Sequence, residues 1–325
     1  MGRASVERPL RSLATGLRRA AARPALLGAI WAWHLVLGVA FAVPFFRWLY
    51  EATAYRPAAD VLAERFSFAL LAELQQYDSA RVLAILSAGV GGGLLIATLA
   101  SPLFAAATLA ALRNPALRAR ELSDVAVSLY WPFLRVIVFG RLAALAGALI
   151  VAAALRAVLW PLSDSSWEGA WLVAIGVRAA AAAIVAVLLL AAVDFALVRL
   201  CEHQSRKGLR AWVAGLRFAG SHLVLTFGLW TGITLMLATA LVAFVALREL
   251  TSAASATLPT VLVVGIAVIL QQLFMGARTW LRVGLLGAEQ HVFAHAGALV
   301  TAVDAAREQA PAAWEGAPIE DSRDL

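Results

Sequence analysis

Two ionisable side chains stand inside long apolar segments, where a charged group is costly and usually has a partner or a function. Asp194 lies in "LLLAAVDFALVRL", a turn or so before Arg199, and Arg141 lies in "LRVIVFGRLAALAG", a similar distance after Arg135. At about 1.5 Å per helical residue the two depths nearly match. We therefore predict a buried Asp194–Arg141 ion pair. Such a pair locks helices together more often than it relays protons or ions, and we favour the lock.

Two adjacent amides occupy the middle of another apolar segment, "VVGIAVILQQLFMGARTW". In a helix Gln271 and Gln272 point about 100° apart, so at least one of them should face a neighbouring helix. A hydrogen bond between helices is the commoner use of such an amide, and the lining of a polar path is the rarer one. Both interpretations stay open.

The metal-like pattern in the chain consists of Glu289, His291 and His295. Histidines four residues apart can bind one ion on a helix face. Glu289 precedes both, so the pattern is not the His-Glu-x-x-His of zinc proteases, and no third ligand is near in sequence. We favour a solvated helix face over a metal site and expect no cofactor. Because the chain also has no nucleophile elbow and no nucleotide-binding motif, the sequence favours a protein that is not an enzyme.

These polar residues are sparse because the chain is overwhelmingly apolar. Of its 325 residues 62% are hydrophobic and 14% are charged, and long apolar runs separate the polar clusters. A water-soluble core cannot hide so much apolar surface. The composition therefore excludes a soluble domain and predicts an all-α membrane protein, a bundle of transmembrane helices.

Six segments have the roughly 20 mostly apolar residues that a membrane-spanning helix needs. They cover residues 26–48, 82–112, 134–159, 171–200, 223–247 and 258–286. We expect a basic amphipathic segment over residues 1–24, a six-helix transmembrane domain over 25–290, and a cytoplasmic helix with a loose tail over 291–325. Apolar residues at helical spacing also predict a short surface helix within residues 55–81.

The arginines predict the orientation of the spans. With six spans, the basic clusters of the N-terminal tail and of the second and fourth connections all fall on one side. The positive-inside rule places this side, and both termini, in the cytoplasm. High Ala, Leu and Arg with a single Lys suggest a bacterial protein, so we expect the inner membrane. The net charge of +7 then reflects topology and contact with anionic lipid headgroups, and not nucleic acid.

One stretch of sequence occurs twice. "LRSLATGLRRAAARPALLGAIW" begins at Leu10 and "LRAWVAGLRFAGSHLVLTFGLW" begins at Leu209, and eight residues coincide. Each copy starts as a basic amphipathic helix of the kind that lies in the headgroup layer, and then continues into a span. A weaker third copy starts at Leu117. We predict a unit of one interfacial helix and two spans, used two or three times.

The second half of the chain resembles a group of uncharacterised bacterial six-helix membrane proteins. The resemblance rests on "VDFALVRL", on "GLRAWVAGLRFAGSH" and on "LQQLFMGARTWLRVGLLGAEQ", and it covers Asp194 to Gln290. This group is loosely similar to the membrane domain attached to glycerophosphodiester phosphodiesterases. The resemblance implies that Asp194, Gln271 and Arg278 are matching positions, but it implies no phosphodiesterase activity because no such catalytic domain is present.

Three functions stay open at this point. The first is a non-enzymatic protein that binds or organises a membrane partner or lipid, as the basic interfacial helices suggest. The second is a transporter or channel subunit for a small solute or ion, which the repeat and the polar residues Asp194, Gln271 and Gln272 favour. The third is an intramembrane enzyme that acts on lipid. Convergence of the polar residues on one water-reachable cavity would favour the last two, and dispersal into separate packing contacts would favour the first.

Overall fold

The computed structural model describes residues 7–53, 80, 83–84, 87–160, 169–203, 207–254 and 258–309. All regular structure in these ranges is helical, so the predicted all-α fold is confirmed. The elements in chain order are α1 (Glu7–Ala21), α2 (Pro24–Thr53), the π-helical turn η2 (Ser87–Gly91), α6 (Gly92–Arg113), α7 (Ala119–Val158), α9 (Ala170–His203), α10 (Gly208–Ser221), α11 (Leu223–Ala253) and α12 (Thr260–Gln309).

Six helices are long and apolar enough to cross a membrane, namely α2, α6 with η2, α7, α9, α11 and α12. Each of them overlaps one of the predicted spans, although the first residues of the predicted span 82–112 lie mostly outside the described residues. Large apolar side chains lie exposed along them, for example Ile150, Val242 and Val261, which is 82% exposed. A surface of this kind is stable only in contact with lipid. The chain is a multi-pass membrane protein.

Two helices extend well beyond the predicted spans. α7 begins at Ala119, where the backbone N–H of Arg118 donates a 2.8 Å hydrogen bond to the carboxylate of Glu121 and so caps the helix. α12 runs without interruption to Gln309, because no proline breaks it, so the predicted separate cytoplasmic helix is a continuation of the sixth span. The predicted surface helix within residues 55–81 and the tail after Gln309 fall almost wholly outside the described residues.

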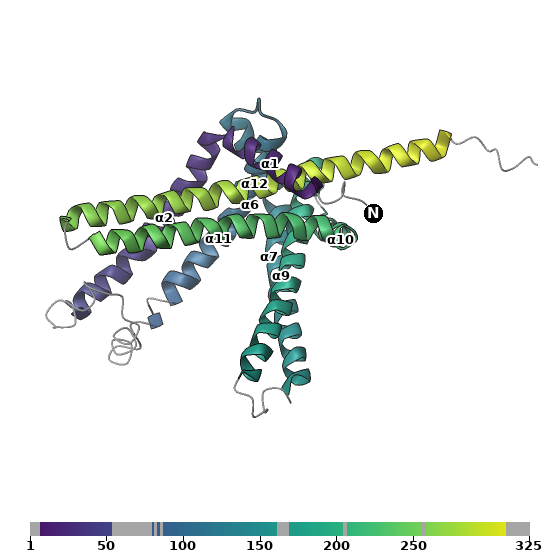
Figure 1. Ribbon diagram of the computed structural model, residues 1–325. Coiled ribbons are helices and arrows are strands. Elements are labelled where there is room, and N and C mark those ends of the chain that lie inside the picture. The colour runs from purple at the N-terminus through teal and green to yellow at the C-terminus, as the bar shows by residue number, and fades with distance from the viewer. Residues whose placement is uncertain are drawn as a thin grey trace, which may run out of the picture.

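Among the described residues, the spans pack most extensively near one end, where they form a hub. Buried residues concentrate in the C-terminal parts of α6 and α9, near the start of α11 and in the middle of α12. Figure 1 shows the α7–α9 and α11–α12 hairpins leaving this hub in different directions. Among the largest fully buried side chains of the hub are Leu109, Phe133, Phe195, Leu200 and Leu285. The hub also carries α1 and α10, the two basic amphipathic helices.

The amphipathic helices join the spans into a ring. α10 packs on α9, and the N-terminal half of α7 shares one buried cluster with the C-terminal half of α6. α1 packs on α12, far away in sequence, and thereby closes the ring. Each predicted repeat unit thus begins by packing on the second span of another unit. This arrangement agrees with the threefold version of the repeat, with units that start at α1, α7 and α10.

The contact between α1 and α12 is a close approach of two backbones. A Cβ atom added to Gly16 would collide with backbone atoms of Gly284 and Ala288. Small residues allow helices in membranes to pack this closely. Beside them the indole Nε1 of Trp280 donates a 3.1 Å hydrogen bond to the carbonyl oxygen of Leu17.

The contact between α10 and α9 is a close backbone approach of the same kind. A Cβ atom added to Gly215 would collide with backbone atoms of Ala192 and Ala196. Gly16 and Gly215 are the seventh residues of the two copies of the repeated stretch. The sequence repeat is therefore also a repeat in packing.

We expect Cys201 to resist thiol reagents in the folded protein. This cysteine is 4% exposed in the hub, where Arg113 donates a 3.2 Å hydrogen bond to its carbonyl oxygen and so ties α6 to the end of α9. A maleimide should label it at least about tenfold more slowly than a cysteine introduced by Ser221→Cys on exposed α10, because only local opening exposes the thiol. Mass spectrometry of the Cys201→Ser, Ser221→Cys protein supplies the reference rate. Equal rates would place Cys201 on the surface.

Candidate functional site

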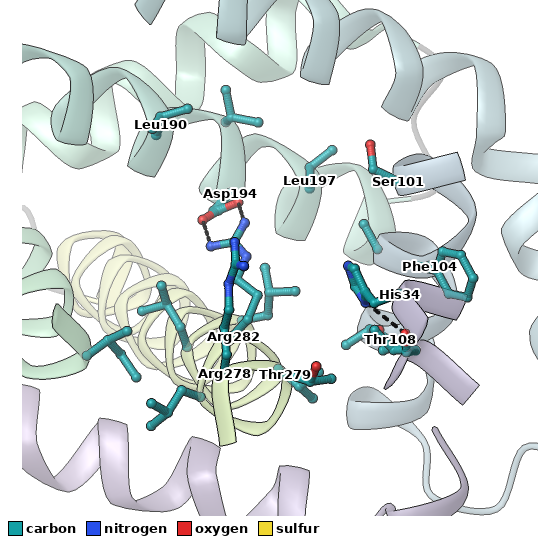
Figure 2. A pocket seen from close by; sticks show the side chains of 18 of the residues that line it. His34, Ser101, Phe104, Thr108, Leu190, Asp194, Leu197, Arg278, Thr279 and Arg282 are labelled. Atoms are coloured by element: carbon teal, nitrogen blue, oxygen red, sulfur yellow. Dashed lines mark hydrogen bonds and ion pairs between the residues drawn. The ribbon is translucent and has the colours of Figure 1, made fainter. Parts of the chain in front are cut away.

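A cavity of about 570 Å³ lies where the six spanning helices meet at the hub. Every span contributes to its lining, which is mostly apolar. The polar and charged residues that line it are His34, Ser101, Thr108, Arg141, Asp194, Thr234, Arg278, Thr279 and Arg282. Figure 2 shows part of this lining. A concave, mostly apolar space with a few polar groups is the usual form of a ligand site.

Asp194 forms an ion pair with Arg282 in this cavity. The guanidinium Nη1 and Nη2 atoms donate to the two carboxylate oxygens over 2.8 and 2.7 Å, a two-pronged contact that Figure 2 shows. Asp194 is 2% exposed, whereas half of the Arg282 side chain is exposed and lines the cavity. Two parallel charge-assisted bonds are the strongest form of carboxylate recognition. The pair fastens α9 to α12.

The prediction of an Asp194–Arg141 pair is therefore wrong in its partner. Arg141 does line the same cavity, but its Nη1 donates to the hydroxyl of Thr98 over 3.1 Å. The reason lies in the direction of the side chains on α9. Val193 faces α7, where it packs against Gly140, and the next residue points about 100° away, towards α12.

The cavity holds more positive than negative charge. Arg278 lies one turn before Arg282 on α12 and extends from that helix in Figure 2. Within the described residues Arg278 makes no hydrogen bond or ion pair, and the contact of Arg141 is to a neutral hydroxyl. Asp194 is the carboxylate in the lining. In the lining, three guanidinium groups thus meet one carboxylate.

The other side of the cavity is neutral. Figure 2 shows His34, Ser101 and Phe104 across from the ion pair. The Nδ1 atom of His34 lies 2.8 Å from the carbonyl oxygen of Ile30. Because a carbonyl oxygen only accepts, we assign the proton to Nδ1, and Nε2 is the nitrogen left for another partner. The cavity is suited to a molecule with an anionic end and a less polar remainder.

Glu289 lies in the interior and not on a solvated helix face. It is fully buried, and within the described residues neither carboxylate oxygen has a hydrogen-bond partner. His295 is exposed and His291 is partly exposed, and their ring centroids are 4.1 Å apart. Two residues along a helix correspond to about 200° of rotation, so Glu289 points away from His291. The structure separates the carboxylate from both imidazoles.

Gln271 and Gln272 do not belong to the central cavity. They line a separate groove of about 380 Å³ beside α11, together with Phe244 and Arg248. At least one amide therefore faces a neighbouring helix, as expected, although neither makes the expected hydrogen bond within the described part of the chain. Of the predicted set, Asp194, Arg141 and Arg278 line the cavity. The two glutamines, Glu289 and the histidine pair lie outside it, so the polar residues neither converge fully nor disperse fully.

Arg282 is the site residue that sequence analysis misses. A signal for it was present, because Arg278, Arg282 and Glu289 are spaced by four and then seven residues and so share one face of an apolar helix. An ionisable stripe of this kind indicates an interior face more strongly than the position of any one residue does.

Comparison of the chain with models of protein families, with curated protein sequences and with solved structures finds no match. The functional proposal therefore rests on the geometry and the charge of the cavity.

Proposed function

We propose that this protein binds an anionic amphiphile in the cavity between its spans and serves as a binding or organising protein, not as an enzyme. The observation that carries the proposal is the pair of guanidinium groups, Arg141 and Arg278, that no carboxylate in the lining neutralises. The ligand class is a lipid-like molecule with a phosphate or carboxylate group. Its apolar part would contact the Leu, Ile and Val residues of the lining.

The electrostatic cost of the arginines in the lining supports this proposal. A charged side chain at membrane depth costs about 2.5–3.5 kcal/mol on insertion scales. A bound anion lowers this cost, because the planar guanidinium group donates two parallel hydrogen bonds to phosphate or carboxylate. Arg141 and Arg278 come from α7 and α12, so one headgroup could join two hairpins that diverge elsewhere.

The position of the hub suggests where the ligand comes from. The basic amphipathic helices α1 and α10 lie at the hub, and the positive-inside rule favours a cytoplasmic location for them. We propose a bacterial inner-membrane protein with both termini in the cytoplasm. The cytoplasmic leaflet supplies anionic lipid, which basic residues attract.

We expect Arg278→Ala to weaken binding of an anionic lipid to the cavity by about 10- to 100-fold, the effect of losing one or two charge-assisted hydrogen bonds. The measurement is native mass spectrometry of the full chain, titrated with phosphatidylglycerol after removal of native lipid. Gln271→Ala is the matched control, because it removes a polar side chain from the same helix outside the cavity. Equal affinity of the Arg278→Ala and native proteins would disprove the proposal.

Transport is the second candidate function, and one observation favours it. All six spans line the cavity, so a relative movement of the hairpins could open it to either side. The test is movement of labelled phosphatidylglycerol between leaflets of vesicles that contain the purified protein. Movement that Arg278→Ala abolishes would establish transport, whereas binding without movement supports the organising function.

A further inference from the structure

A second basic groove lies on the outside of the hub, between the end of α9 and α10. Its volume is about 690 Å³, and it shares no residue with the central cavity. Three arginines line it, Arg199 from α9 and Arg210 and Arg217 from α10, and Phe218 and Phe293 add aromatic surface to the lining. It is therefore independent of the proposed cavity function.

The three arginines of this groove have no acidic partner among the described residues. Arg210 and Arg217 are two turns apart and so lie on one face of α10, while Arg199 approaches from the last turns of α9. Within the described residues none of the three makes an ion pair or donates a hydrogen bond. Like charges held around one groove repel each other, and an anion between them removes this repulsion.

The side chains at the rim of the groove are apolar, whereas a soluble anion needs contact with water. Leu209 and Val213 line it and are 62% and 38% exposed. Guanidinium groups beside exposed aliphatic side chains form the typical surface of a helix in the headgroup layer. A phosphate can contact the arginines here while acyl chains contact Leu209 and Val213. A free phosphate ion would make no use of the apolar rim.

We infer that the groove of Arg199, Arg210 and Arg217 binds the phosphate headgroup of an anionic phospholipid. The two arginines of α10 hold the phosphate from one side and Arg199 holds it from the other. The lipid then covers the outer face of α10, whose inner face packs on α9 through Gly215. It acts as an additional contact between α10 and the hub.

The test is lipid binding to the full chain with Arg210→Gln and Arg217→Gln combined. Delipidated protein is titrated with phosphatidylglycerol or with phosphatidylcholine, and native mass spectrometry counts the bound lipids. We expect the double variant to lose one bound phosphatidylglycerol, with affinity reduced by about 10- to 30-fold, because each arginine near a membrane surface contributes on the order of tenfold or less. Phosphatidylcholine should not occupy the site in either protein.

The matched control combines Arg156→Gln with Arg248→Gln. It removes the same amount of charge near the C-terminal ends of α7 and α11, away from the hub. This control and Arg278→Ala should both keep the groove lipid, so failure of the cavity proposal is distinguishable from failure of this one. If the double variant does not fold, the exposed single change Arg217→Gln takes its place, with about a threefold to tenfold loss expected. Unchanged lipid counts, or equal binding of the two lipids, would overturn the inference. Competition by millimolar inorganic phosphate would also overturn it, because the ligand would then be the free ion.

Discussion

The Asp194→Ala protein is expected to unfold with a free energy about 3 kcal/mol below that of the native protein. The change leaves Arg282 without its two hydrogen bonds in a cavity that already has excess positive charge. Losing one partner of a buried pair costs about 3–5 kcal/mol, and we expect the lower end because half of the Arg282 side chain is exposed. Tryptophan fluorescence during unfolding in mixed detergent and dodecyl sulfate micelles measures the difference.

Double-mutant cycles identify the partner of Asp194. With Arg282→Ala as the second change, we expect a coupling energy of about 2 kcal/mol, because either single change already breaks the pair. With Arg141→Ala as the second change, we expect about 0.5 kcal/mol or less, since Arg141 contacts Thr98 instead. The reverse order of the two coupling energies would show that the pairing predicted from depth is the real one.

Gly16→Leu is expected to have an effect of similar size for a different reason. A side chain at this position meets the backbone of Gly284 and Ala288, which cannot move aside as a flexible side chain can. Overpacking of a close contact usually costs about 1–3 kcal/mol, and we expect 3 kcal/mol or more where the obstacle is backbone. The Tm of the purified protein should fall and α1 should become accessible to protease, because α1 can no longer sit on α12.

Gly28→Leu is the control for this experiment. Gly28 lies on α2 with no atom near the place of its Cβ, so leucine there should leave the Tm within about 1 °C. Gly215→Leu should match Gly16→Leu, because it collides with α9 in the same way. Gly220→Leu, also on α10 but facing open space, serves as its control. A stable Gly16→Leu protein would mean that α1 is not held against α12 as described.

The sequence was sufficient to predict the six spans, because hydropathy over about 20 residues depends on composition and not on packing. It also predicted α1 and α10 from the spacing of apolar and basic residues. The ends of α7 and α12 were predicted less well. α7 continues through Pro132 and α12 continues beyond residue 286, outside the apolar runs that hydropathy detects.

The candidate site was predicted only in part, since its members come from all six spans. Depth along a helix follows from residue number, so Asp194 and Arg141 were correctly expected to lie close to each other. Which arginine pairs with Asp194 depends on the direction in which its side chain points around the axis of α9 and on which helix lies on that side. Because of these two factors, Arg282 pairs with Asp194, Gln271 lies outside the cavity and Glu289 points into the interior.

The closure of the ring by α1 and α12 has a consequence for synthesis at the ribosome. α1 is made first among the described helices and α12 last, and the hydrogen bond from Trp280 to Leu17 joins residues 263 positions apart. Until α12 has been made, near the end of translation, the face of α1 that carries Gly16 has no α12 to pack against. Chains that stop before the sixth span would keep that face open, and membrane proteases could recognise them by it. Insertion of α12 is therefore the step that closes the ring.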